Sequence, residues 1–451
     1  MSELLELAHR VVGRAFATEQ LEAFVTHERN FMAKAYDGDL ESTSSSEPRG
    51  AGARLVSEGR TGFAYTTDLS EDGLDDVVAK ARANARHATE DDAAGLAEAK
   101  GDVPRVDGLF DESQRSITPE DKAAFVLELE RLTREHDPRI RAVEESVYAD
   151  AEIEVAIATS TGIAASFRET DAWCFSIAIA EDGGDNEVGF EFGLGRSLSA
   201  LDAAGVARRA AERALGVLGA EKISSARMPV VFDPYVAGQF LGVIGRVLTG
   251  EAVQKGRSLF AGKLEDKVAG KITLVDDGRI AGAPGSAPWD AEGVATQRTE
   301  VITDGVLTSY LYDTVSGRRE GRASTGNASR SGFKSLPGPS PTNLAFEPTG
   351  VTRADLLRSA GRALLVQDFH GVHSGANPIS GDFSVGVTGH LLENGEVGKP
   401  VKEVTIAAAM LDILSRMTAV ADDRRWLPFG GSYGGATTLV SEMTVAGLSD
   451  S

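Results

Sequence analysis

The sequence contains one cysteine, no long apolar run and few clustered basic residues. A lone cysteine cannot form an intramolecular disulfide or build a metal site from several thiolates. Cys174 lies in an alternating, strand-like run and is expected to be a small buried hydrophobe. Without 18 consecutive apolar residues, no membrane-spanning helix is predicted. The first residues lack the basic start and apolar stretch of a signal peptide, so we expect a cytoplasmic protein without membrane contact.

The charge balance is strongly acidic. Lys and Arg number 46 against 68 Asp and Glu, which gives a formal net charge of −22 over 451 residues. Binding to nucleic acid depends on clustered Lys and Arg that neutralise phosphates, so direct nucleic-acid binding is disfavoured. Hydrophobic residues at 42% and charged residues at 25% are typical of globular domains, and the length suffices for two or three of them.

Two regions with different patterns follow one another along the chain. In the first, helical spacing alternates with strand-like runs, and Thr118, Pro119 and Asp121 form a clear helix start. Residues 41–47 are expected to be a short exposed loop. Helices are predicted at residues 4–15, 74–87, 118–136 and 201–218, and strands at residues 52–58, 62–67, 140–147, 153–159 and 173–180.

The pattern changes after a linker at residues 221–227. Strands dominate from there on, with helices predicted at 236–248 and 353–365. We therefore predict an α+β fold. An N-terminal α/β domain over residues 1–220 is followed by a mainly β C-terminal domain over residues 221–451.

The most distinctive segment is glycine-rich and covers residues 369–405. Alternating apolar residues flank an Asn394-Gly395 turn, which predicts a long β-hairpin. Before the hairpin, glycines and an Asn-Pro turn bring backbone groups and one carboxylate close to whatever approaches the loop. The loop residues that we select as candidates for binding a substrate or a partner are Gly371, Gly375, Asn377, Gly381 and Asp382. A tight loop that merely turns the sheet is the alternative.

Two further motifs accompany this segment in a fixed order. The first places Arg49, Gly50, Gly52 and Arg54 before a Gly59-Arg60 turn, and the second runs from Asp290 and Glu292 through residues 304–307 to 324–328. Together the three blocks resemble the TldD/PmbA family of modulator and metalloprotease proteins over nearly the full chain. The resemblance implies a role in proteolysis.

The catalytic members of that family hold zinc on a HExxxH helix, in which two His bind the metal and the Glu activates water. In the matching stretch of this sequence, the two His positions fall on Leu241 and Arg246 and the Glu position falls on Gly242. Leu has no lone pair, Gly has no side chain, and an Arg guanidinium stays protonated and repels a divalent cation. No Cys follows Cys174, although catalytic members supply a late Cys as a third ligand.

The resemblance therefore implies a TldE/PmbA-like non-catalytic subunit, with no catalytic residue, metal or cofactor of its own. Zinc is expected in the partner, a TldD-like zinc-bearing subunit that forms a heterodimer with this chain. Unfolded peptides and small proteins are the implied substrates. One alternative is a homodimeric peptide-binding protein without a protease partner.

Three other patterns could carry chemistry. His370 and His373 form an HxxH arrangement near Asp368 and Asp382 that could bind a metal, although such residues are more often surface groups. Residues 430–434 satisfy G-x-S-x-G, which would make Ser432 the nucleophile of a hydrolase. The residues around it favour strands, so a turn between strands is the preferred interpretation. Residues 193–197 lack the third glycine of a dinucleotide fingerprint, and phosphate binding there is not supported.

Overall fold

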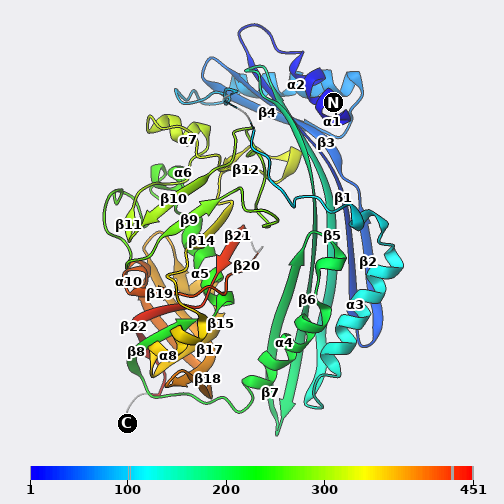
Figure 1. Cartoon of the computed structure of the whole chain (residues 1–451). Helices are drawn as coiled ribbons and strands as arrows, with labels where there is room; N and C mark the ends of the chain where they lie inside the picture. The colour runs from blue at the N-terminus through cyan, green and yellow to red at the C-terminus, as the bar shows by residue number, and fades with distance from the viewer. Residues whose placement is uncertain (1, 100, 102, 428–430, 449–451) are drawn as a thin grey trace.

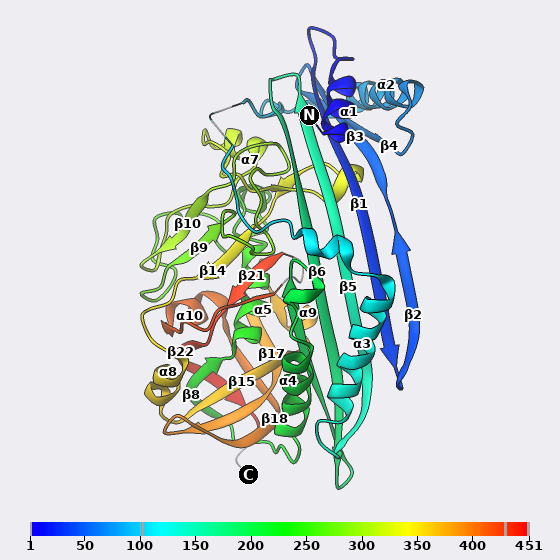
Figure 2. The same ribbon diagram turned by 45° about the vertical axis from the view of Figure 1, so that its right-hand side comes forward.

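The computed structural model describes residues 2–99, 101, 103–427 and 431–448. Two halves lie side by side. The first half is built on a sheet of very long strands, and the second half packs along one face of that sheet (Figure 1). Figure 2, turned by 45°, shows helices α3 (Pro119–Arg134) and α4 (Ala203–Gly216) on the long sheet.

The long sheet has seven strands in the order β4-β3-β1-β5-β6-β7, with β2 paired to β1. β1 pairs with β3 through its first part and with β2 through its second part, so β2 and β3 follow each other along one edge of β1. β7 forms the opposite edge of the sheet. The strands are β1 (Gln20–Tyr36), β2 (Asp39–Ser46), β3 (Arg49–Ser57), β4 (Arg60–Thr66), β5 (Ile140–Thr159), β6 (Ala164–Asp182) and β7 (Asp185–Gly195).

The helices of this half begin where the sequence predicts. Ser2 accepts a hydrogen bond from the Leu5 amide at the start of α1 (Glu3–Val12), and Thr118 and Asp121 form a reciprocal capping box at the start of α3. The other helices are α2 (Glu71–His87), η1 (Glu112–Ser116) and η2 (Leu198–Ala200).

Two predictions in this half need correction. The runs at 140–147 and 153–159 are strand as predicted, but they belong to one continuous strand, β5, because β6 pairs with residues 140–158 and β1 with residues 146–159. Residues 41–47 do not form a loop. They lie largely in β2, whose eight residues are all exposed and which is held by its ladder with β1 rather than by buried side chains.

The two faces of the long sheet have different partners. On one face, Tyr148 and Cys174 are buried beneath α3 and α4. The opposite face, which we call the inner face, is directed toward the second half, where Phe24 and Phe167 pack with Trp289. The second half therefore lies against a prepared apolar surface of the first.

The second half contains two larger sheets. One has the order β11-β10-β9-β14-β21-β20; the other has the order β15-β8-β22-β18-β17-β16, includes β19 beside β22, and closes on itself through a β15–β17 pairing. The strands are β8 (Ala226–Phe232), β9 (Leu274–Asp277), β10 (Arg298–Thr303), β11 (Val306–Leu307), β12 (Ala328–Ser329), β13 (Gly338–Pro339), β14 (Asn343–Phe346), β15 (Ala363–His370), β16 (Ala376–Asn377), β17 (Asp382–Glu393), β18 (Glu396–Ala409), β19 (Met417–Val420), β20 (Arg425–Leu427), β21 (Ser432–Gly435) and β22 (Thr438–Ala446).

Helix α5 (Pro234–Gly245) runs through the core of this half, where Phe240, Leu241 and Ile244 are fully buried. The predicted helix at 353–365 was too long. It ends at Ala360, and residues 363–365 open β15, because Gly361 takes a positive φ of 63° and terminates the helix. The other helices are α6 (Gly250–Gln254), α7 (Thr314–Arg319), η3 (Gly332–Lys334), α8 (Arg353–Ala360), α9 (Val372–Gly375) and α10 (Met410–Ser415).

The predicted α+β class is confirmed, with helices and strands mixed in the first half and strands dominant in the second. The predicted hairpin is confirmed as well, since β17 and β18 flank the Asn394-Gly395 turn, where both residues have positive φ. Within the described ranges, none of the helices is both long and apolar enough to span a bilayer.

Candidate functional site

Helix α5 carries the positions that hold zinc in the catalytic members of the family that the sequence resembles. Leu241 is fully buried in the core, whereas Arg246 is exposed at the C-terminal end of the helix. Gly242 faces Tyr433, and a Cβ there would lie 3.4 Å from the Tyr433 ring. Burial raises the pKa of Tyr433, and the nearby Arg246 guanidinium offsets part of that rise.

The glycines of α5 explain this packing. A Cβ at Gly238 would lie 2.7 Å from Leu427, and a Cβ at Gly245 would lie 2.9 Å from the Tyr433 ring. The helix therefore lies directly against β20 and β21, and any side chain at position 242 would begin in contact with the Tyr433 ring. The hydrocarbon side chain of Leu241, the hydrogen atom of Gly242 and the guanidinium of Arg246 cannot coordinate zinc. The residues present therefore do not fit that metal. Among the described residues, no three His, Cys, Asp or Glu side chains gather as a metal site.

The glycine-rich loop before β17 is tied down by its own side chains. The Asn377 carboxamide accepts hydrogen bonds from the amides of Ile379 and Ser380, and the Ser380 hydroxyl donates to Asp382 at 2.6 Å. Gly371 and Gly381 take positive φ values of 73° and 86°. Gly375 lies against β17, where a Cβ would meet the Ser384 carbonyl at 2.0 Å. The five candidate residues thus lie along one short segment, from the N-cap of α9 at Gly371 through α9 and β16 to the start of β17 at Asp382, and their role in binding stays a prediction.

The HxxH pair lies on the same loop. His370 and His373 are exposed, and the His370 Nε2 atom lies 2.8 Å from the Thr388 hydroxyl. Burial raises the pKa of the neighbouring Asp368, and His370 offsets part of that rise. Nothing in this arrangement adds the further ligand that a zinc site needs among the described residues.

Ser432 does not lie in a turn, so that interpretation was wrong. It opens β21, which pairs with β14 in parallel and with β20 in antiparallel orientation. Gly430, the first glycine of the motif, lies outside the described residues. The next element is the strand β22, whereas a nucleophile elbow needs a helix there. The Ser432 side chain is 4% exposed and its hydroxyl has no hydrogen-bond partner.

Side chains alternate along β21, and this places Ser432 and Tyr433 on opposite faces. Tyr433 packs on α5, whereas Ser432 lines a cleft between the two halves of the molecule. The cleft has a volume of about 930 Å³ and follows the edge of β7. All three tryptophans of the chain line it: Trp173 from β6 on one wall, and Trp289 and Trp426 from the second half.

A buried charge cluster joins the two halves at β1 and β3. We call Glu22, Arg54, Glu292 and Arg330 the Glu22 cluster. Arg54 donates to Glu22 at 2.5 Å and to Glu292 at 2.9 Å, and Arg330 donates to Glu22 at 2.7 Å. Burial alone would raise the pKa of Glu22, but Arg330 and Arg54 outweigh it and hold that pKa below its ordinary value.

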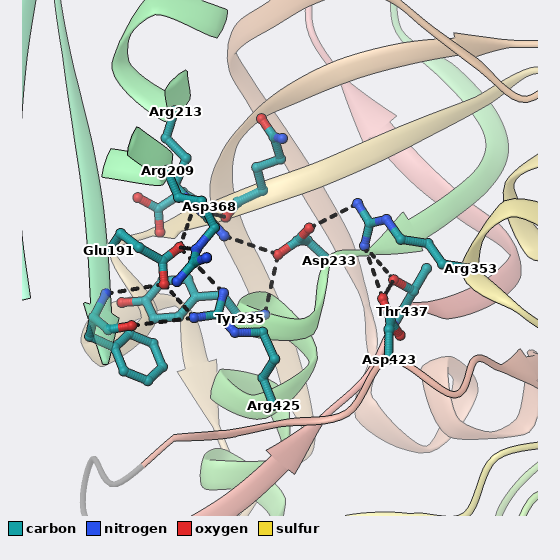
Figure 3. A network of polar contacts seen from close by, with 12 residues as sticks. Glu191, Arg209, Arg213, Asp233, Tyr235, Arg353, Asp368, Asp423, Arg425 and Thr437 are labelled. Carbon is teal, nitrogen blue, oxygen red and sulfur yellow. Dashed lines mark hydrogen bonds and ion pairs between the residues drawn. The ribbon is translucent and has the colours of Figure 1, made fainter. Parts of the chain in front are cut away.

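A second charge cluster lies at the β7 end of the cleft (Figure 3). We call Glu191, Arg209, Arg213 and Arg425 the Glu191 cluster. Glu191 is 1% exposed and accepts from Arg425 of β20, while Arg213 of α4 approaches it to 3.3 Å. Burial would raise the pKa of Glu191, but these guanidiniums, led by Arg425, keep it below its ordinary value. Arg209 stands 3.7 Å away, and its Nε atom has no hydrogen-bond partner.

The Glu191 cluster extends to the start of α5 (Figure 3). Arg213 also contacts Asp233, the N-cap of α5, at 3.2 Å, and Arg353 of α8 contacts the same carboxylate at 3.1 Å. Arg353 in turn contacts Asp423 at 3.2 Å. Both halves of the molecule therefore hold the N-terminus of the helix that carries the altered zinc positions.

Other carboxyl groups beside the cleft have raised pKa values, in contrast to the lowered pKa of Glu191. Burial and the neighbouring Asp171 raise the pKa of Glu169 to about 8, and burial raises the pKa of Asp171 although Arg196 lies 2.7 Å from it. Burial and the nearby Glu292 raise the pKa of Asp290 to about 8. Burial therefore favours the protonated form of these three carboxyl groups, whereas the guanidiniums of the cleft stay charged.

The sequence interpretation did not select most residues of this cleft. One signal was available, because Glu191 interrupts the apolar run of β7 with a charge, and a charge in such a strand is rarely buried without partners. The partners Arg209, Arg213 and Arg425 come from distant segments, so no spacing pattern relates them. The tryptophans likewise come from separate elements.

Models of one protein family match the chain in three consecutive parts. The PmbA/TldA metallopeptidase C-terminal domain matches residues 225–447, the central domain matches residues 112–218, and domain 1 matches residues 21–85. The predicted two-domain division, with its boundary at residues 220 and 221, stays a prediction.

Individual proteins show the same similarity. Metalloprotease PmbA of Escherichia coli O157:H7 is 28% identical over 91% of this chain and 88% of that protein. The metalloprotease PmbA homolog of Haemophilus influenzae is 30% identical over 89% of this chain and 87% of that protein. The crystal structure of TldE from Thermococcus kodakarensis matches with a TM-score of 0.85 and 21% identity, covering 98% of this chain and 99% of that chain, and supports the fold.

Proposed function

The chain belongs to the PmbA/TldD metallopeptidase family, and from this premise we propose that it is the non-catalytic subunit of a zinc metalloprotease. In this proposal a TldD-like subunit supplies the zinc and the HExxxH helix, and the two chains form a heterodimer. The substrates are unfolded peptides and small proteins.

The observation that carries this proposal is the packing of α5. Its ligand positions hold Leu241, Gly242 and Arg246, and Tyr433 occupies the space beside Gly242. These groups cannot bind zinc or activate water, so catalysis by the family's chemistry requires another chain. The helix is nevertheless intact, and its N-terminus is fixed by Arg213 and Arg353.

The glycine-rich loop is the candidate contact with substrate or partner. It is held in one conformation by Asn377 and Asp382, while Ile379 is 54% exposed at its tip. A fixed loop with an exposed apolar residue suits recognition, because little conformational freedom is lost on binding.

The test is peptide cleavage by the two chains together. The TldD-like subunit and this chain are each assayed alone and then mixed, with an unstructured peptide as substrate. We expect cleavage in the mixture and none by this chain alone, and elemental analysis should find no stoichiometric zinc in this chain. Full activity of the TldD-like subunit alone would contradict the proposal. So would one zinc per chain that is lost on His370→Ala.

The loop is tested in the same assay with Gly381→Leu. A leucine at φ +86° is strained, and we expect lower turnover with the zinc content of the partner unchanged. Gly350→Leu is the matched control, because Gly350 has φ +82° and lies in an exposed turn away from the loop. Equal turnover by the two variants would remove the loop from the proposal.

A further inference from the structure

The charge balance of the cleft is the reverse of that of the whole molecule. The chain has 46 Lys and Arg against 68 Asp and Glu. Of the described residues that line the cleft, more are basic than acidic: Arg196, Arg209, Arg330 and Arg425 against Asp171, Asp202 and Asp290. Burial also raises the pKa of Asp171 and, together with Glu292, that of Asp290, which favours their uncharged forms. A cleft that is locally positive within a strongly acidic molecule attracts anions.

The positive charge is densest at the β7 end of the cleft, in the Glu191 cluster (Figure 3). Glu191 accepts hydrogen bonds from the Phe192 amide at 3.1 Å and from both Nη atoms of Arg425. The Arg213 Nε atom lies 3.3 Å from the same carboxylate. A carboxylate has about four acceptor sites, so these N–H groups already use those of Glu191. No acceptor site of Glu191 is left for Arg209.

Arg209 is therefore the cation of the cluster whose charge is least compensated. Its Nε atom lies 3.7 Å from Glu191, beyond hydrogen-bond distance, and is shielded from water without a partner among the described residues. The side chain as a whole is 36% exposed and lines the cleft. Asp202 also lines the cleft, but its carboxylate caps α4 by accepting from the Gly205 amide at 2.9 Å. A shielded N–H without an acceptor costs free energy that an anionic ligand could recover.

Apolar side chains adjoin this guanidinium. Val206 lies one turn before Arg209 on α4, and Val206 and Leu201 both line the cleft. The Arg425 guanidinium lies over the Phe192 ring, 5.1 Å from its centroid. An apolar wall beside a cation favours an organic anion with an apolar body over a hydrated inorganic ion. One uncompensated guanidinium balances a single negative charge, which a carboxylate carries and a phosphate group exceeds near neutral pH.

We propose that Arg209 binds the carboxylate of an organic acid at the β7 end of the cleft, with Arg425 beside it. The apolar body of the acid lies against Leu201, Val206 and Phe192. The cleft volume of about 930 Å³ lies within the range of sites for small molecules. The site belongs wholly to this chain, and it requires neither zinc nor a partner. A free acid and the C-terminus of a peptide both carry this group, and the experiment separates the two sources.

The first test is a titration of the isolated full-length protein with phenylacetate and with phenylacetamide. The two compounds have the same shape, and only the first carries a charge. Because all three tryptophans line the cleft, their fluorescence reports binding directly. We expect saturable binding of phenylacetate, with a Kd at least tenfold lower than that of the amide, and weaker binding as sodium chloride is added.

The second test removes the guanidinium. Arg209→Gln should raise the Kd of phenylacetate at least tenfold, and Arg209→Lys should raise it less, because lysine keeps the charge but loses the planar fork. Arg208→Gln is the matched control. Arg208 is the preceding residue of α4, is 52% exposed, pairs with Glu212 and does not line the cleft. That variant should bind within about twofold of the unaltered protein.

A third titration, with acetyl-Gly-Gly-Phe as free acid and as amide, identifies the source of the carboxylate. Tighter binding of this free acid than of phenylacetate supports the site and assigns it to a peptide C-terminus. Weaker or equal binding supports the site and assigns it to a small acid.

Four outcomes would overturn the proposal. These are no saturable binding of phenylacetate at millimolar concentration, equal Kd values for phenylacetate and its amide, equal Kd values for Arg209→Gln and Arg208→Gln, or displacement of phenylacetate by an equal concentration of inorganic phosphate. If Arg209→Gln does not fold, the comparison of acid and amide decides.

Discussion

The Glu22 cluster and the Glu191 cluster both join the two halves, yet they differ in charge balance and access to water. The Glu22 cluster has two carboxylates for two guanidiniums, and its side chains are at most 5% exposed. The Glu191 cluster has one carboxylate for three guanidiniums, and the side chains of Arg209 and Arg425 are 36% and 31% exposed. The Glu22 cluster is thus charge-balanced and buried. The Glu191 cluster has more guanidiniums than carboxylates and is partly accessible to solvent at the end of the cleft.

The largest loss of unfolding free energy is expected for a substitution in the Glu22 cluster. Glu22→Gln leaves Arg54 and Arg330 buried with one carboxylate between them, and breaking such a pair costs about 3–5 kcal/mol of unfolding free energy. Chemical denaturation measures it. Glu47→Gln, at a carboxylate that is 57% exposed, is the control and should change little. Equal losses in the two variants would mean that burial of the cluster has no special effect.

Glu191→Gln should cost less, about 1–3 kcal/mol, because Arg425 and Arg209 can turn toward water when their carboxylate is neutralised. The same denaturation experiment applies, together with the tryptophan emission spectrum, since Trp426 is adjacent to Arg425. A loss as large as that of Glu22→Gln would show that the two clusters are equally rigid.

The raised pKa of Glu169, beside the cleft, predicts that the stability of the folded chain depends on pH. Glu169 has a pKa of about 8 in the folded chain against 4.5 ordinarily, so the folded state holds a proton that the unfolded state has lost between these values. Stability should therefore fall as the pH rises from about 4.5 to about 8. Thermal melting against pH should show a shallower fall for Glu169→Gln. A parallel curve would contradict the raised pKa.

The smallest effect is expected at Ser432. Its hydroxyl is buried without a partner, so Ser432→Ala removes a desolvation cost and should leave the unfolding free energy unchanged or raised by up to about 1 kcal/mol. Ser176→Ala is the contrast, because the Ser176 hydroxyl contacts those of Thr133 and Ser146, and it should cost about 1 kcal/mol. A fluorophosphonate probe should leave Ser432 unlabelled. Stoichiometric labelling that Ser432→Ala abolishes would instead favour the hydrolase hypothesis.

Sequence patterns correctly predicted the features that depend only on neighbouring residues. The capping box at Thr118 and the turn at Asn394-Gly395 depend on neighbours in the chain, and both were confirmed. Residues 363–365 were assigned wrongly because pairing with distant strands decides their conformation. Residues 41–47 were assigned wrongly although they pair with the preceding strand β1 across the Asp37-Gly38 turn, a local signal that the sequence analysis did not use. The altered zinc positions on α5 could be read from the sequence. The cleft could not, since Trp173 and Trp426 lie more than 250 residues apart and come to line the same cleft only through tertiary packing.

The pairing of β1 with β5 has a consequence for the order in which the first half folds. β1 ends at Tyr36 and β5 begins at Ile140, so their ladder closes a loop of about one hundred residues. The β5–β6 and β6–β7 hairpins involve far shorter loops and should form first, with β1 added to an existing edge. Pulse-labelled hydrogen exchange would then protect the β6 amides before those β1 amides that bond to β5. Until β5 leaves the ribosome, β1 to β4 form a sheet whose β1 edge is unpaired along the β5 side and open to chaperones and to wrong strand partners.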